Sequence, residues 1–152
     1  MPVLFWDTSA LVKKYFAEVG SETVQVLLGA PGHFHNIAPL TLAEVSSAIV
    51  RRANPDQATE LLAAFDEDVR PGGLVNVLEF PDDIFGRAVE LVRRHRLRGC
   101  DALQLVAAVA WAVAFRELED VGEQDYLFVC ADDALNVAAR AEGLAVINPA
   151  KT

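Results

Sequence analysis

Four acidic residues of this chain stand beside short apolar runs or at the start of helix-like segments, and their types suit metal chemistry. They are Asp7, Glu44, Asp101 and Asp132. Hard divalent cations such as Mg²⁺ and Mn²⁺ prefer carboxylate oxygens, keep part of their water shell and activate a bound water. Four carboxylates in one small volume repel one another unless cations lie between them. If the fold brings these acids together, we expect hydrolysis of a phosphodiester.

Each of the four acids also has a simpler explanation as a helix cap. An aspartate at a helix start accepts hydrogen bonds from free backbone N–H groups, and three of the acids stand at predicted helix starts. Glu44 lies three residues after Thr41, which is the spacing of a capping box. Taken singly, each acid fits capping. The four together favour a metal site, and one residue can serve both purposes.

Apolar runs and helical periodicities alternate along the chain. Strands are predicted at residues 2–6, 33–38, 74–80, 126–130 and 144–147. Helices are predicted directly after Asp7 and at 21–29, 41–53, 55–70, 81–95, 101–115 and 132–142, with Ser21 and Thr41 as opening residues and Gly143 as a stop. This pattern predicts one α/β domain over residues 1–152, with a parallel central sheet and helices on both faces. Ligands of such folds bind beyond the carboxyl ends of the strands, where Asp7 and Asp132 are expected.

Composition bounds the remaining choices. The chain has 152 residues, of which 53% are hydrophobic and 23% charged, as in one folded domain. A net charge of −9 means that a nucleic acid would have to be held by a local basic patch. The longest apolar run, 102–115, is too short for a membrane span, and the first residues lack the basic start of a signal peptide, so we expect a cytoplasmic protein. Two cysteines and three scattered histidines do not have zinc-site spacing.

Four segments in order resemble the signature blocks of PIN-domain ribonucleases, and most closely the VapC-type toxins of prokaryotic toxin–antitoxin pairs. They are residues 5–11, 42–45, 100–105 and 129–135, and the closing segment 141–149 is similar as well. The resemblance implies a metal-dependent ribonuclease that uses Mg²⁺ or Mn²⁺, with Asp7, Glu44, Asp101 and Asp132 as catalytic metal ligands and no covalent enzyme intermediate. It also implies an RNA substrate, a small VapB-type antitoxin as partner, and a homodimer.

One position departs from the family pattern. Relatives usually carry threonine or serine two residues before the fourth acid, and this chain has Cys130 there. Ser9 remains as a hydroxyl beside the expected site, where it either supports the acids or only the first helical turn. Asp133 is expected to serve as a surface or capping residue, because consecutive helical residues point in different directions.

A cluster of arginines precedes the third acid, and it could contact RNA phosphates: Arg93, Arg94, Arg96 and Arg98. The alternative is a solvated helix end whose cations complement the helix dipole. Further basic candidates are Lys13, Lys14, Arg51 and Arg52. Trp6 and Trp111 lie within apolar runs and are expected in the core.

Three other functions are compared with the residues. A receiver-like signalling domain also binds Mg²⁺ in an acidic crevice, but it requires an acidic pair after the first strand and a lysine after the last. Here Asp7 is followed by Thr8 and Ser9, and Lys151 lies beyond the final strand. A phosphatase that uses an Asp-x-Asp nucleophile is disfavoured by Ser9. The third function is a catalytically silent PIN-like or receiver-like Mg-binding interaction domain, which the presence of all four acids disfavours.

Overall fold

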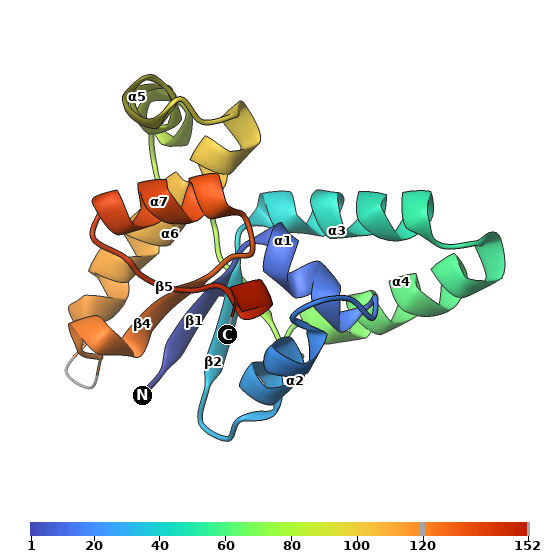
Figure 1. The fold of residues 1–152 in the computed structure, drawn as a ribbon. Helices are drawn as coiled ribbons and strands as arrows, with labels where there is room; N and C mark the ends of the chain where they lie inside the picture. The colour runs from blue at the N-terminus through green and yellow to red at the C-terminus, as the bar shows by residue number, and fades with distance from the viewer. Residues whose placement is uncertain (119–120, 152) are drawn as a thin grey trace.

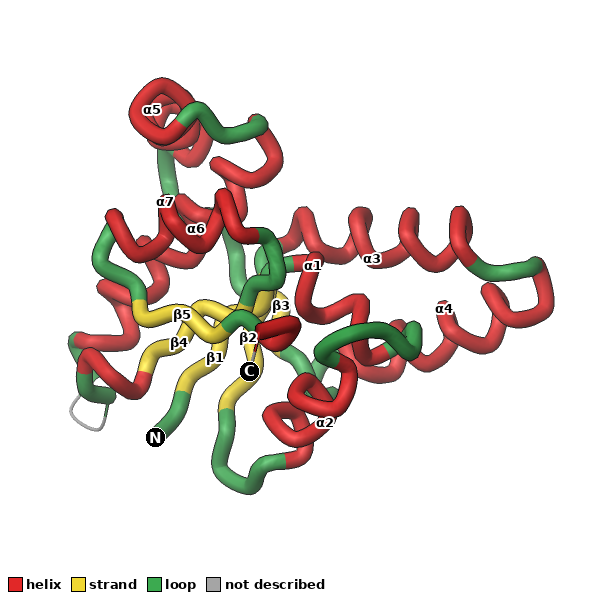
Figure 2. Tube along the Cα trace, viewed as in Figure 1, coloured by secondary structure: helices red, strands yellow, loops and turns green. Residues whose placement is uncertain are grey.

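Short apolar segments pair as five parallel strands in the residues that the computed structural model describes, 1–118 and 121–151 (Figure 2). The strands are β1 (Val3–Trp6), β2 (Phe34–Ile37), β3 (Asn76–Val77), β4 (Tyr126–Val129) and β5 (Ala145–Ile147). Their order is β3-β2-β1-β4-β5, and every neighbouring pair is parallel. The direction of winding therefore reverses between β1 and β4, which is the place where such sheets bind ligands.

Helices cover both faces of this sheet (Figure 1). They are α1 (Thr8–Leu11), α2 (Ser21–Gly29), α3 (Pro39–Arg52), α4 (Pro55–Val69), α5 (Ile84–His95), α6 (Gly99–Arg116) and α7 (Asp133–Ala141). Short 3₁₀ turns follow α1 at Val12–Lys14, precede β4 at Glu123–Asp125 and occur after β5 at Pro149–Lys151. The predicted α/β class, with a parallel sheet between helical layers, is confirmed.

The central strand shows why its sequence is apolar without a break. Val3 and Phe5 pack in one hydrophobic cluster with α5, α6 and α7, while Leu4 and Trp6 pack in a second cluster with α1 to α4. All four side chains are fully buried. A parallel strand covered on both faces needs this composition. The core position predicted for Trp6 is confirmed, and Trp111 packs against the first cluster at partial burial.

Helix α6 carries the longest apolar run of the described chain. By length and composition alone it could cross a membrane, but that test is also passed by core helices of soluble proteins. Its buried side chains, among them Ala102, Leu105 and Ala108, pack with the strands and with α5. Core packing therefore accounts for the apolar residues at these buried positions.

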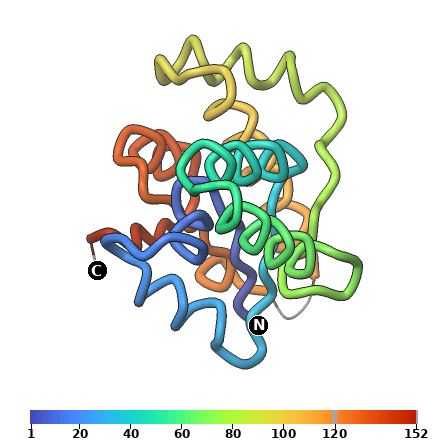
Figure 3. Tube along the Cα trace, turned by 90° about the vertical axis from the view of Figure 1, so that its right-hand side faces the viewer, coloured from blue at the N-terminus to red at the C-terminus, as the bar shows by residue number. Residues whose placement is uncertain are grey.

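Helices α3 and α4 form an antiparallel arm that projects beyond the sheet (Figures 1 and 3). Asn54 caps α4 by accepting a hydrogen bond from Gln57 N at 2.9 Å, and Pro55 occupies the first turn, as predicted. Near the other end of α4, Asp68 accepts a hydrogen bond from Tyr15 Oη at 2.6 Å and pairs with Lys14. The arm is thus fixed to the segment that follows α1.

Several predicted boundaries at helix starts were wrong. Helix α3 begins at Pro39 with Ala38 as its cap, so Thr41 lies inside the first turn and the predicted capping box is not formed. Gly20, at φ 96°, takes the N-terminal position of α2 that Ser21 was expected to fill. This left-handed backbone suits glycine, which has no Cβ to clash.

The segment before α5 also differs from its prediction. The predicted strand 74–80 is reduced to Asn76 and Val77, because only these residues pair with β2 in the sheet, followed by one further hydrogen bond from Leu78 N to Ile37 O. Helix α5 starts at Ile84 and not at Pro81, since Asp83 adopts a left-handed φ of 55° immediately before it.

Candidate active site

The four acids predicted from the sequence come together at the carboxyl edge of the sheet. Asp7 directly follows β1, and Asp132 lies beyond β4 at the start of α7. Glu44 is carried by α3 and Asp101 by the first turn of α6. These helices form a chain of contacts, since α1 touches α3, α3 touches α6 and α6 touches α7.

The electrostatics of the acids show that they act as neighbours. The pKa of Asp7 is raised by burial and, to a smaller extent, by the negative charges of Glu44 and Asp101. The pKa of Asp101 is raised by burial and then by the charges of Asp132 and Glu44. Asp7 and Asp101 therefore each lie near enough to other acids of the set for those charges to raise their pKa.

Asp7 is the most enclosed of the four. Its side chain is 5% exposed, and burial raises its pKa from 3.8 to about 6, against hydrogen bonds from Ser9 that lower it. Ser9 donates its backbone N–H at 3.0 Å and its hydroxyl at 2.5 Å to Asp7 Oδ2. A cation beside Asp7 would offset the cost of keeping this buried carboxylate charged.

Capping explains two of the acids and fails for the other two. Asp7 caps α1, and Asp132 caps α7 by accepting from Leu135 N at 2.9 Å. Asp101 is not the capping residue of α6, because that position belongs to Arg98. Glu44 is not part of a capping box, as described above. Helix capping therefore does not account for the presence of Glu44 and Asp101 at this edge.

Glu44 is positioned by a buried polar junction that sequence reasoning missed. Thr8 Oγ1 donates to Glu44 Oε1 at 2.7 Å. Gln104, 1% exposed, donates from Nε2 to Glu44 Oε1 at 3.1 Å, to Thr8 Oγ1 at 3.2 Å and to Thr41 Oγ1 at 2.7 Å. The available signal was the glutamine itself, one polar residue inside an apolar helix and three positions after Asp101.

A second polar group links Asp7 to the end of β4. The Ser9 hydroxyl, which donates to Asp7, also accepts from Ala131 N at 3.0 Å. Cys130 Sγ lies 3.6 Å from Ser9 Oγ and 3.7 Å from Asp7 Oδ2, in the place where the family pattern has a hydroxyl. Burial and the charge of Asp7 raise the pKa of the Cys130 thiol, so it stays protonated and can act as a weak donor. Ser9 supplies the stronger hydrogen bond.

The predicted arginine cluster is divided by the fold. Arg98 is the N-terminal cap residue of α6, and its positive charge partly counteracts the raised pKa of Asp101. Arg94 is paired with Glu142 at 2.5 Å, and Glu142 also contacts His95 at 2.7 Å. Arg98 is therefore electrostatically coupled to the acids, whereas Arg94 is committed to another carboxylate.

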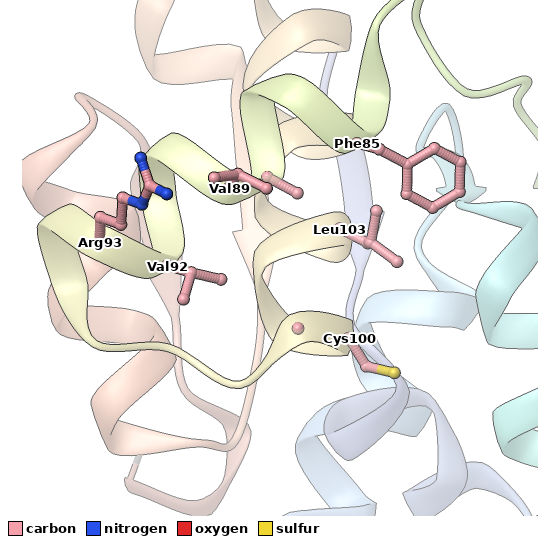
Figure 4. A pocket seen from close by; sticks show the side chains of 8 residues that line it. Phe85, Val89, Val92, Arg93, Cys100 and Leu103 are labelled. Atoms are coloured by element: carbon pink, nitrogen blue, oxygen red, sulfur yellow. The ribbon is translucent and has the colours of Figure 1, made fainter.

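The other two arginines, Arg93 and Arg96, lie at the C-terminal end of α5. Arg96 ends α5 in a left-handed conformation at φ 56°. Arg93 lines a cavity of about 410 Å³ between α5 and α6 (Figure 4). The other walls are mainly apolar, with Phe85 and Leu103 at one end and Cys100 beside them. This cavity offers no set of polar groups for catalysis.

The donor set at the acidic site fits a hard divalent cation. All four side chains offer carboxylate oxygens, which are the ligands that Mg²⁺ and Mn²⁺ prefer. Among the described residues, no group of three or more His, Cys, Asp or Glu is already arranged to hold a metal ion. Binding would therefore have to draw the carboxylates closer together, against the mutual repulsion that the pKa values of Asp7 and Asp101 record.

Comparison with known proteins places this geometry in a family. The family model described as the PIN domain matches residues 4–114. The structure is similar to FitAcB from Neisseria gonorrhoeae, with a TM-score of 0.65, 14% identity, and coverage of 98% of this chain and 99% of that chain. VapBC2 from Rickettsia felis, solved bound to a DNA fragment from its promoter, gives a TM-score of 0.62 at 15% identity, covering 96% and 98%.

A third similar structure is VapBC-5 of the VapBC family of toxin–antitoxin systems, from Mycobacterium tuberculosis. Its TM-score is 0.59 at 17% identity, with 97% of this chain and 99% of that chain covered. A comparison with curated protein sequences found no match. At these identities the structural likeness establishes the fold, and the family model covers more than two thirds of the sequence. The chain belongs to the PIN domain family.

Proposed function

We propose that this protein is a ribonuclease that hydrolyses RNA phosphodiester bonds with Mg²⁺ or Mn²⁺. The observation that carries the proposal is the convergence of Asp7, Glu44, Asp101 and Asp132 from four separate segments, with mutual effects on the pKa values of two of them. A divalent ion bound there would supply an activated water and would stabilise the departing phosphate oxygen.

The chain's own residues prepare this site in distinct ways. Ser9 and the capped start of α1 hold the Asp7 carboxylate in place, while Thr8 and Gln104 hold Glu44. Asp101 makes no hydrogen bond through its side chain in the part of the chain that the structure describes, so its oxygens are available to a ligand. Arg98, beside Asp101, is suited to bind a phosphate of the substrate.

The biological setting is proposed from the family. One of the similar structures, VapBC-5, is a member of the VapBC family of toxin–antitoxin systems. By this likeness we propose that the protein is a cytoplasmic toxin, that it pairs with a small VapB-type antitoxin, and that it forms a homodimer. The arginines Arg93, Arg94 and Arg96 remain proposed RNA contacts, of which Arg94 would have to leave Glu142.

The main competing function is a catalytically silent Mg²⁺-binding interaction domain. It would keep the acidic site and the fold but would not cut RNA. Asp101→Asn separates this function from hydrolysis, because the side chain keeps its size and loses the charge that a metal ligand needs. We expect cleavage of single-stranded RNA in excess Mg²⁺ or Mn²⁺ to fall by on the order of a hundredfold or more, each tenfold being about 1.4 kcal/mol.

A matched control is Asp56→Asn, which removes the same charge from the first turn of α4, at a distance from the acidic site. Its cleavage rate should match that of the wild type. Circular dichroism and melting curves should show that both variants are folded. Wild-type cleavage by folded Asp101→Asn would remove Asp101 from the catalytic group, and absence of metal-dependent cleavage by the wild type would reject the proposed function.

A further inference from the structure

A groove begins at the acidic site and follows the exposed side of α3. Its volume is about 500 Å³, and Glu44 stands at its inner end beside Thr8. Small side chains line its middle, and two arginines lie at its outer end. The small side chains are those of Ala43, Ser47 and Ala48, and the arginines are Arg51 and Arg52. The groove is thus continuous with the proposed catalytic acids.

Helical spacing aligns the residues of this groove. Glu44, Ser47 and Arg51 are related by three and then four positions, so they lie on one face of α3. Seven residues of helix span about 10 Å at 1.5 Å per residue. The small side chains between the two ends leave this path open, because alanine and serine project little from the helix surface.

The two arginines at the outer end differ in their contacts. Arg52 donates to Glu18 Oε2 at 2.7 Å, and its guanidinium lies 4.1 Å from the centre of the Phe16 ring. Arg51 is exposed and forms no ion pair with a described residue. A cation without an acidic partner, at the end of a groove that starts at carboxylates, is suited to bind an anionic group that extends from the acidic site.

We propose that this groove binds the part of the RNA strand next to the scissile phosphate, and that Arg51 contacts one of its phosphates. The proposal rests on the proposed ribonuclease function. Single-stranded RNA fits the observations because it carries a phosphate at every nucleotide, so a strand held at the acidic site presents further negative charge along the groove. The carboxylate of Glu44 repels a phosphate at the inner end, whereas Arg51 attracts one at the outer end.

The first measurement compares Arg51→Gln with the wild type in RNA cleavage. We expect kcat/KM to fall five- to tenfold, mainly through KM, and the slope of log affinity against log salt to decrease by about 0.7, the value for one phosphate contact on a single strand. The matched control is Arg70→Gln, which changes an exposed arginine at the C-terminal end of α4. The ion pair of Arg70 with Glu67 is also exposed, so its loss should cost little. This control should behave as the wild type.

The second measurement identifies the phosphate. A series of RNA substrates carries one uncharged methylphosphonate linkage, moved stepwise away from the cleavage site. One position should slow the wild type by the same factor as Arg51→Gln, and should slow Arg51→Gln no further, as in a double-mutant cycle. Equal effects of every linkage on both proteins would overturn the subsite, as would a kcat/KM of Arg51→Gln equal to that of the wild type. If the wild type cuts none of the substrates, the ribonuclease function itself fails.

Discussion

Asp7 combines burial, like-charged neighbours and hydrogen bonds from Ser9 in one carboxyl group. Its pKa of about 6 in the folded protein lies above the ordinary value of 3.8. The folded state therefore holds this proton more tightly than the unfolded state does. The stabilisation is fully present below about pH 4 and is lost as the pH rises through about 6. Over that range the loss is on the order of 3 kcal/mol.

We therefore expect the metal-free protein to be less stable at neutral than at mildly acidic pH because of Asp7. Between pH 5 and pH 7.5, the free energy of unfolding in EDTA should fall by about 1 kcal/mol more for the wild type than for Asp7→Asn, whose amide does not titrate. Urea denaturation of both proteins at the two pH values measures this difference. Parallel changes in the two proteins would show that Asp7 titrates normally.

Asp7 should also determine how strongly a bound metal ion stabilises the fold. At pH 7.5, Mg²⁺ or Mn²⁺ at a hundredfold excess over its dissociation constant should stabilise the wild type by about 2.7 kcal/mol. The gain should be much smaller in Asp7→Asn, which offers one ligand charge less. A wild-type melting temperature that does not respond to saturating metal would contradict the site.

The sequence predicts the acids of the site more readily than the residues that hydrogen-bond to them. Asp7 and Asp132 were predictable because each follows an apolar strand, and parallel strands end at one edge of the sheet. Gln104 was not predictable as a site residue, since its role depends on how α3 crosses α6. Periodicity along one helix does not determine which side chain of another helix it meets.

At the scale of elements, the junction of α1, α3 and α6 depends on one side chain. Gln104 of α6 donates to Thr8 of α1 and to both Thr41 and Glu44 of α3. Loss of these hydrogen bonds would leave the buried Thr41 hydroxyl without its Gln104 donor, which costs about 1–3 kcal/mol. It would also remove one of the two side-chain hydrogen bonds that hold Glu44, leaving the one from Thr8.

We expect Gln104→Met to fold with reduced stability and to bind Mn²⁺ at least tenfold more weakly than the wild type. Gln104→Glu has the same shape as the wild-type side chain but places a negative charge against Glu44. This variant should still bind Mn²⁺, and its affinity should depend on pH differently from that of the wild type. Calorimetric titration well below both melting temperatures separates binding from stability. A Gln104→Met protein with lower melting temperature and wild-type Mn²⁺ affinity would reduce Gln104 to a purely structural role.

Element boundaries show where local patterns lose their predictive power. Asn54 and Pro55 fixed the start of α4 because both act through the adjacent backbone. Thr41 and Pro81 were misplaced at helix starts, since Pro39 and the left-handed Asp83 determine where α3 and α5 begin. Local residue preferences allow several such starts, and tertiary packing selects among them.

At the scale of the whole molecule, negative charge dominates the surface. The net charge is −9, and six of the thirteen lysines and arginines form ion pairs with acids among residues 1–118 and 121–151. Of the remaining cations, Arg98 lies beside the acidic site and Arg51 at the end of the α3 groove. The net negative charge thus repels a polyanionic substrate, whereas Arg98 and Arg51 attract it near the site.

This distribution predicts a weak dependence of RNA binding on monovalent salt. If Arg98 and Arg51 are the only phosphate contacts, the slope of log affinity against log salt should be near −1.4, at about 0.7 per contact on a single strand. Each of the other proposed contacts, Arg93, Arg94 and Arg96, would steepen the slope by about 0.7. Binding should instead depend strongly on the divalent ion, because the four acids repel the scissile phosphate until a cation lies between them. Cleavage would confound fluorescence anisotropy with a single-stranded RNA, so binding to the wild type is measured with Ca²⁺ in place of Mg²⁺, because Ca²⁺ takes the same kind of oxygen ligands but polarises a bound water less. A slope of −4 or steeper, or full affinity in EDTA, would mean that a broader basic surface binds the RNA and that the acidic site is not the centre of recognition.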